Sequence, residues 1–125
     1  MNLKQYYKQL LSQNTELVTL LGGSNKIIAS YPQEVKIFPS VIFEDTNSTD
    51  VEFSDNLPEG ISANVRIHVF TKTISGFPKA EAIAEIVHQI FRHDYWACTM
   101  NQDTSDVQDN VRHRVMDFRR EFYSV

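Results

Sequence analysis

The chain contains only one cysteine, Cys98, among its 125 residues. A single thiol excludes an internal disulfide framework and a zinc cluster that is held by several thiolates. The sequence also has no apolar run near the roughly 20 residues that a membrane-spanning helix needs. Its first residues lack the apolar segment of a secretory signal. We therefore expect a protein that folds in a reducing cytoplasm and stays soluble.

Glycine is also scarce, at four residues, and its placement excludes two kinds of catalytic loop. Gly22 and Gly23 form an isolated pair before a predicted strand, whereas a phosphate-binding glycine loop precedes a helix. The Gly-x-Ser-x-Gly sequence of α/β-hydrolases is absent from the chain. We predict that the protein uses no cofactor.

Length and charge narrow the class of protein further. Hydrophobic residues make up 42% and charged residues 22%, which is close to the average for globular domains. We interpret residues 1–125 as a single domain, because the chain is long enough for one core and too short for two. The formal net charge of -4 argues against a protein whose main role is to grip phosphate backbones.

Local patterns predict a mixed order of helices and strands. Asn14 is a suitable N-cap for a second short helical turn, and the glycine pair is suited to end it. The sequence from Ser75 to Pro78 predicts the start of a later helix, with the proline in its first turn. The predicted helices cover 3–11, 15–21 and 78–91, and the predicted strands cover 26–31, 40–43, 61–73, 95–100 and 111–123.

The segment from Ile61 to Val69 gives the clearest strand, because apolar and polar residues alternate along it. Phe70 breaks this pattern, and we expect it to lie against a helix end or at a subunit contact. We predict an α+β fold in which an antiparallel or mixed sheet of four to five strands carries a helix on one face, in the order α-β-β-β-α-β-β. A sandwich or barrel fits poorly, since a helix precedes the last two strands.

The histidines and the cysteine do not form a recognisable reactive site. His88 and His93 are five residues apart, which does not match the four-residue spacing of metalloprotease helices. His68 and His113 lie on predicted strands among residues expected to face solvent, so we interpret both as surface histidines. Cys98 has apolar neighbours, which predicts core packing and a raised thiol pKa. We predict neither a catalytic residue nor a metal ligand.

Two charged segments are candidates for contact with partners. Residues 44–59 contain six acidic and no basic residues, and we interpret them as a long hairpin or protruding loop, in which a strand can continue through Val51 and Phe53. The last predicted strand concentrates arginine, although Asp117 and Glu121 reduce its field. Complementary charges of this kind suit a head-to-tail ring. The candidate contact residues are Glu44, Asp45, Asp50, Glu52, Asp55, Phe70, Arg112 and Arg114.

The layout of these elements resembles that of tail-completion, or tail-terminator, proteins of long-tailed bacteriophages and prophages. The resemblance spans nearly the whole chain and concerns the order of elements rather than a catalytic motif. It rests on Leu20-Leu21-Gly22-Gly23, the strand 26–30, Tyr31-Pro32, the segment 38–43, the long strand 61–70, the helix 79–91 and the closing strand pair.

The resemblance implies a virion-assembly subunit without enzymatic activity. Such a subunit forms a ring, commonly a hexamer, that caps the tail tube and offers a docking surface to the head connector. The implied partners are further copies of the chain, the tail tube protein and the head–tail connector protein. The implied location is the tail or neck of the virion, after assembly in the host cytoplasm.

Alternatives remain open at the level of sequence. Another neck, connector or minor tail component would have a similar layout. A small enzyme would need a pocket in which at least two titratable groups converge. A nucleic-acid-binding domain would use the arginines of the last strand, and its binding would be sensitive to salt.

Overall fold

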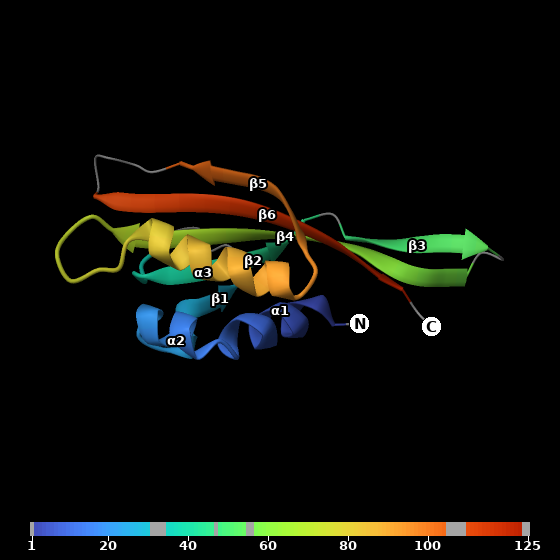
Figure 1. Cartoon of the computed structure of the whole chain (residues 1–125), viewed down its shortest axis with the longest axis horizontal. Coiled ribbons are helices and arrows are strands. Elements are labelled where there is room, and N and C mark those ends of the chain that lie inside the picture. Colours follow the sequence, from blue (N-terminus) through green and yellow to red (C-terminus); the bar gives the residue numbers. More distant parts are fainter. Residues whose placement is uncertain (1, 31–34, 47, 55–56, 105–109, 124–125) are drawn as a thin grey trace.

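The computed structural model describes residues 2–30, 35–46, 48–54, 57–104 and 110–123. Three α-helices and a 3-10 turn accompany one sheet of six strands (Figure 1). The helices are α1 (Leu3–Ser12), α2 (Thr15–Leu21) and α3 (Ala80–His93), with the 3-10 turn at Ser24–Lys26. The strands are β1 (Ile27–Ala29), β2 (Ser40–Asp45), β3 (Thr49–Ser54), β4 (Leu57–Lys72), β5 (Ala97–Asp103) and β6 (Val111–Tyr123). None of the described helices combines the length and apolarity needed to cross a membrane.

Capping residues determine where the first two helices begin and where the second one ends. The Asn2 side chain accepts a hydrogen bond from the Gln5 amide at the start of α1. Asn14 accepts one from the Leu17 amide at 2.9 Å, which confirms its predicted role at the start of α2. Gly22 ends α2 with φ of 88°, a left-handed conformation that glycine adopts without a steric penalty.

The strands are arranged in the order β1-β2-β4-β6-β5, and β3 also pairs with β4. Strands β1 and β2 are parallel, whereas the other neighbours are antiparallel. The predicted α+β class with a mixed sheet is therefore confirmed. The sheet contains six strands rather than four to five, because residues 49–54 pair with β4 as a separate strand, β3, at the place where the hairpin interpretation allowed a strand through Val51 and Phe53.

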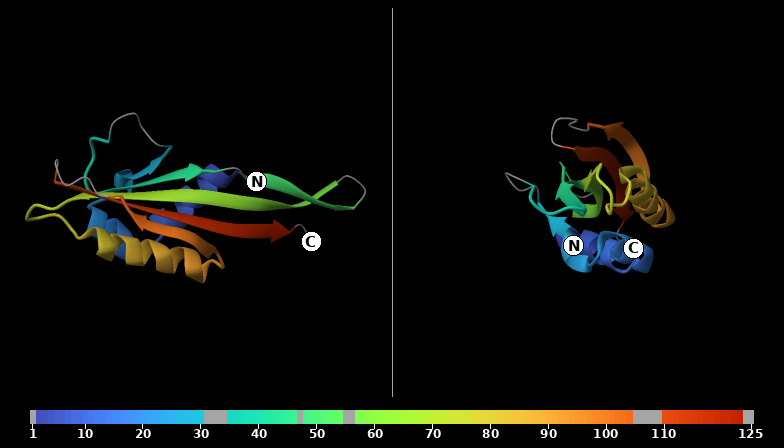
Figure 2. Two further views of the ribbon diagram at one scale, coloured as in Figure 1. Left: turned by 90° about the horizontal axis from the view of Figure 1, so that it is seen from above. Right: turned by 90° about the vertical axis from the view of Figure 1, so that its left-hand side faces the viewer.

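All three α-helices cover the same face of the sheet (Figure 2). The residues of β4 that face them are fully buried, as the alternating pattern predicts: Ala63, Val65, Ile67 and Val69. The register places Met116 beside Ile67 and Phe118 beside Val65 on the same face, so β6 supplies the neighbouring row of the core. The opposite face of the sheet carries no helix.

The start of α3 differs by two residues from the prediction. The helix begins at Ala80 after Lys79 as its cap, so Pro78 lies before the first turn rather than within it. The Pro78 carbonyl instead accepts a hydrogen bond from Thr71 Oγ1 at 2.8 Å. This contact joins the segment before α3 to the end of β4.

Strands β3 and β4 continue past the body of the sheet as a two-stranded ribbon (Figure 1). Pairing between β4 and β6 ends where Gly60 faces Tyr123, while β3 still pairs with the residues of β4 before that point. A Cβ atom on Gly60 would lie 2.2 Å from the Phe122 carbonyl oxygen. Glycine is therefore required where β6 comes closest to the root of the ribbon.

Replacing Gly60 by alanine should move the end of β6 away from β4. We expect Gly60→Ala to lower the free energy of unfolding by about 1–3 kcal/mol, because the added methyl group meets backbone that cannot rotate aside. Denaturant unfolding measures the change. Gln102→Ala, on the exposed edge strand β5, is the control and should stay within about 0.5 kcal/mol of the parent chain. Equal midpoints for the two variants would contradict the steric role of Gly60.

Candidate protein-contact surfaces

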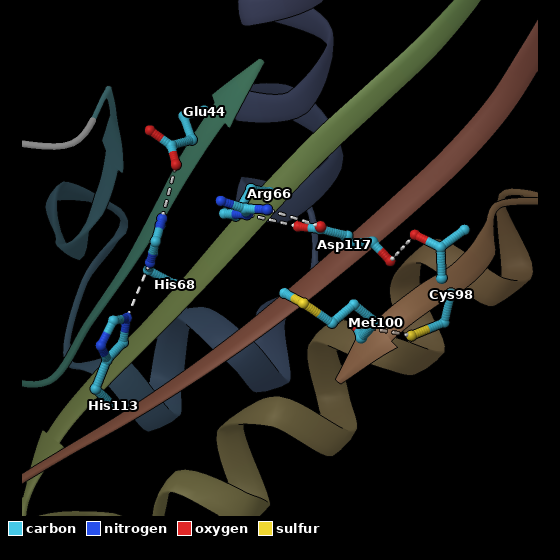
Figure 3. Close-up of polar contacts among 8 residues, drawn as sticks. Glu44, Arg66, His68, Cys98, Met100, His113 and Asp117 are labelled. Atoms are coloured by element: carbon cyan, nitrogen blue, oxygen red, sulfur yellow. Dashed lines mark hydrogen bonds and ion pairs between the residues drawn. The ribbon is translucent and has the colours of Figure 1, made fainter. Parts of the chain in front are cut away.

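A chain of polar contacts crosses three strands on the helix-free face of the sheet (Figure 3). His68 on β4 lies between Glu44 on β2 and His113 on β6. The His68 Nε2 atom is 2.9 Å from Glu44 Oε1, and His68 Nδ1 is 2.9 Å from His113 Nε2. His113 Nδ1 in turn lies 2.9 Å from Thr104 Oγ1. The contacts tie the three strands together by their side chains as well as their backbones.

The two histidines are not surface residues, and that interpretation of the sequence was wrong. His68 is only 7% exposed and His113 is partly buried. Phe70 is also buried, and its ring stacks on His113 with 4.0 Å between centroids. Phe38 covers the other side, with its centroid 6.5 Å from that of Phe70. Phe70 thus packs inside the chain on the helix-free face, rather than against a helix end.

The buried position changes the acid–base behaviour of His113. Burial disfavours the charged ring, and nearby His68 adds to this effect, while Asp103 opposes it. Together these groups lower the pKa of His113 from 6.5 to about 4. His113 therefore stays neutral at neutral pH and acts as a structural hydrogen-bonding group.

The candidate acidic contact residues have different surroundings. Glu44 is partly buried by its bond to His68, and Asp45 is exposed at the end of β2, where it accepts a hydrogen bond from Ser48. The side chains of Asp50 and Glu52 lie outside the described part of the chain, as does the whole of Asp55. Only Glu44 and Asp45 therefore have described surroundings. The contact role of the acidic segment stays a prediction.

Arginines on β4 and β6 form ion pairs or hydrogen bonds with other residues of the chain. Arg66 on β4 forms a two-pronged pair with Asp117, at 2.8 and 3.0 Å. This pair removes part of the charge on the helix-free face. The neighbouring contacts along the strand are Arg112 with Asp103 at 3.9 Å, Arg114 with Asn101 at 2.9 Å and Arg119 with Glu121 at 3.2 Å.

A polar cluster around Asp94, just after α3, was not predicted from the sequence. The Asp94 carboxylate accepts hydrogen bonds from Tyr6, from Trp96 Nε1 at 2.9 Å and from Arg120 Nη1 at 3.0 Å. Burial and the Asp94 carboxylate raise the pKa of Tyr6 to about 12, so its hydroxyl remains a donor. The cluster joins α1, β6 and the turn after α3. Residues separated by up to 114 positions meet here, which no local pattern could indicate.

Cys98 is exposed, which corrects the prediction that it packs in the core. The pairing of β5 with β6 shifts between Cys98 and Met100, and this irregularity breaks the alternation expected along the strand. Partial burial raises the pKa of the thiol, in the predicted direction, and the thiol lies 3.4 Å from the Met100 carbonyl oxygen (Figure 3). The environment disfavours the reactive thiolate.

Two large apolar side chains are exposed on either side of α3. Tyr95, after α3, is 84% exposed, and Ile74, before α3, is 50% exposed. A groove of about 950 Å³ runs between α2 and α3, and its floor includes Leu20, Phe77 and Ile86. Sequence reasoning missed both the tyrosine and the groove. Within the described ranges, no three His, Cys, Asp or Glu side chains are grouped so as to hold a metal ion.

Comparison with known proteins shows the fold. No protein-family model matches the chain, and no curated protein matches it. Among solved structures, the chain is similar to a component chain of the virion of the native gene transfer agent (GTA) particle, with a TM-score of 0.62. The two are 18% identical, and the match covers 93% of this chain and 90% of the other. At this identity the likeness shows a common fold that extends over almost all of both chains.

Proposed function

We propose that the protein is a structural virion subunit, and more specifically a tail terminator. In this role, copies of the chain form a hexameric ring that caps a tail tube. The ring offers a surface to the head connector. The observation that carries the proposal is the likeness to a virion component over 93% of the chain. This likeness agrees with the family that the element order resembles.

The side-chain arrangement supports assembly rather than catalysis. Two polar pairs, His68 with His113 and Arg66 with Asp117, are closed by mutual hydrogen bonds on the helix-free face of the sheet. Groups that are saturated in this way hold strands together and have little capacity left for a substrate. The exposed tyrosine and the open groove instead provide the kind of surfaces that protein partners use.

Nucleic-acid binding is less well supported by the surface charges. The arginines of β6 face acidic or amide partners within the chain, as described above, and Asp117 and Glu121 lie among them. Phosphate binding would have to displace these partners. Another neck or connector component has the same support from the fold as a tail terminator has, so the choice between them depends on the partner.

Light scattering over a concentration series, with and without cognate tail tubes, tests the proposal. We expect tubes to bind the chain at one end and to promote its association into a ring of about six copies, visible by electron microscopy. Binding to the head connector without binding to tubes would indicate another neck component. A chain that stays monomeric and ignores tubes contradicts the terminator proposal.

A parallel titration with duplex DNA serves as the control for the third alternative. We expect no salt-dependent affinity, and the double variant Arg112→Gln/Arg114→Gln should behave like the parent chain. A nucleic-acid-binding domain would instead bind DNA tightly at low salt and weaken in this variant.

A further inference from the structure

Tyr95 is presented to solvent in an unusual way. Its side chain is 84% exposed, and its backbone has φ of 68°. A bulky residue in the left-handed region is strained, whereas glycine or asparagine at this position would be tolerated more easily. The ring gains almost no burial within the chain to offset the strain. Strain of this kind, where it is maintained, commonly marks a functional contact.

The turn that carries Tyr95 is firmly held. The Tyr95 amide donates to the Arg92 carbonyl at 3.1 Å, and the Trp96 amide donates to the Phe91 carbonyl at 2.9 Å. Trp96 is buried beneath the turn, and Arg120 Nη1 donates to the Asp94 carbonyl at 2.7 Å. A side chain on such a fixed turn loses little conformational freedom on binding, which favours affinity.

The charge beside Tyr95 is positive on one side. The Arg120 guanidinium carbon lies 5.9 Å from the centre of the Tyr95 ring, and Arg92 is exposed one turn earlier on α3. Asp94 is the acidic group nearby, and it is engaged by Arg120. The exposed surface is therefore an aromatic ring with Arg92 as its exposed basic neighbour, a combination that is frequent at the centre of protein interfaces.

The groove between α2 and α3 is complementary to the Tyr95 surface in apolar character and in charge. Its floor is apolar, with Leu20, Phe77 and Ile86, and its rim carries Glu16 and Glu85. Both glutamates are exposed, and in the described part of the chain neither has an ion pair. A volume of about 950 Å³ is ample for a tyrosine ring and a neighbouring arginine.

Both surfaces involve helix α3. The groove is lined by Ala82 in the first turn of α3, whereas Tyr95 follows the last turn. The groove extends along α3 to Gln89, and Tyr95, which is 84% exposed, is not among its lining residues. The ring therefore leaves the groove of its own chain open, and a second copy can fill it.

We infer that Tyr95 of one copy inserts into the groove between α2 and α3 of a second copy. Arg92 then faces Glu16 and Glu85 across the contact. Because the two surfaces are different patches of the chain, the contact is head-to-tail and repeats until a ring closes. This inference rests on the self-association that the proposed function requires, and it assigns the residues that produce it.

The substitution Tyr95→Gly separates assembly from folding. Removing the ring also relieves the left-handed strain, so the isolated variant should unfold at the same temperature as the parent chain or at a higher one. Self-association in the presence of tubes should weaken by at least about thirtyfold, as expected for loss of a central aromatic contact. A merely structural role for Tyr95 would give the opposite pattern, with lower stability and unchanged assembly.

A second variant tests the groove. Ala82 is exposed on α3, so Ala82→Trp should leave the fold intact while filling the groove, and assembly should weaken to a similar extent. In a mixture of the two variants, Tyr95 of the Ala82→Trp chain can still insert into the open groove of the Tyr95→Gly chain. Each mixed pair can therefore form one contact. We expect the mixture to form mixed dimers that do not grow into rings.

Two matched controls should assemble normally. Ser30→Gly relieves a similar left-handed backbone, with φ of 72°, at a position away from both surfaces. Ile37→Ser removes another exposed apolar side chain, which is 40% exposed. Normal assembly of these controls shows that neither relief of strain nor loss of surface apolarity is enough to dissociate the ring.

The outcomes separate this inference from the proposed function. If Tyr95→Gly and Ala82→Trp assemble like the parent chain, the contact is overturned and the tail-terminator proposal stands. If Tyr95→Gly self-associates normally but no longer binds tubes, the occupant of the groove is not a second copy, and the inference is again overturned. A parent chain that is monomeric even with tubes overturns both.

Discussion

Replacing Phe118 by alanine should lower the free energy of unfolding by about 3–5 kcal/mol. Phe118 is 1% exposed and stacks on Phe91, with ring centroids 4.4 Å apart and planes 10° apart. The pair joins α3 to β6 in the middle of the core, where neighbouring residues cannot collapse into the space left by the ring. Domains of this size have only about 5–15 kcal/mol of stability, so this loss would be a large fraction of the total.

Phe122→Ala is the matched control for this measurement. Phe122 lies four positions later on the same face of β6 but is only partly buried, so its loss should cost less than half as much. Denaturant unfolding of both variants, with m-values compared, gives the two free energies. If Phe122→Ala costs as much as Phe118→Ala, the stacked pair with Phe91 is not the centre of the core.

Acidification should destabilise the chain through His113. The pKa of this residue is about 4 in the fold, compared with its ordinary 6.5. Between these values the unfolded chain binds a proton that the folded chain excludes, so the free energy of unfolding falls as the pH is lowered through this range. The shift corresponds to at most about 3 kcal/mol, and partial solvation of the ring reduces the expected loss to about 2 kcal/mol.

His113→Gln isolates this contribution, because glutamine can donate a hydrogen bond and does not titrate. Urea unfolding at about pH 7 and about pH 4.5 should show a smaller loss of stability in this variant than in the parent chain. His93→Gln, at an exposed position at the end of α3, should lose as much as the parent chain. If all three chains lose the same amount, acid acts through carboxylates and the histidine contacts contribute nothing.

These experiments address different layers of the same architecture. The core that Phe118 anchors keeps the helical layer in place, and α3 in that layer lines the groove and leads into the Tyr95 turn. The histidine contacts hold β2, β4 and β6 together on the other face.

The sequence by itself determined the fold class and most of the elements. Alternation along 61–69 and the helical spacing along 80–91 are local patterns, and backbone geometry converts them directly into a strand and a helix with one apolar face. Capping by Asn14 and the left-handed Gly22 are equally local. Such features could be predicted because each depends on neighbours a few residues away.

Only the tertiary structure decided what the side chains meet. Phe70 and His68 are buried because β6 places His113 beside them from 45 positions away, and Cys98 is exposed because the pairing of β5 is irregular. The strained turn at Tyr95 and the groove between α2 and α3 also arise from packing between distant segments. Register, bulges and helix packing are long-range choices, and a single sequence does not display them as a pattern.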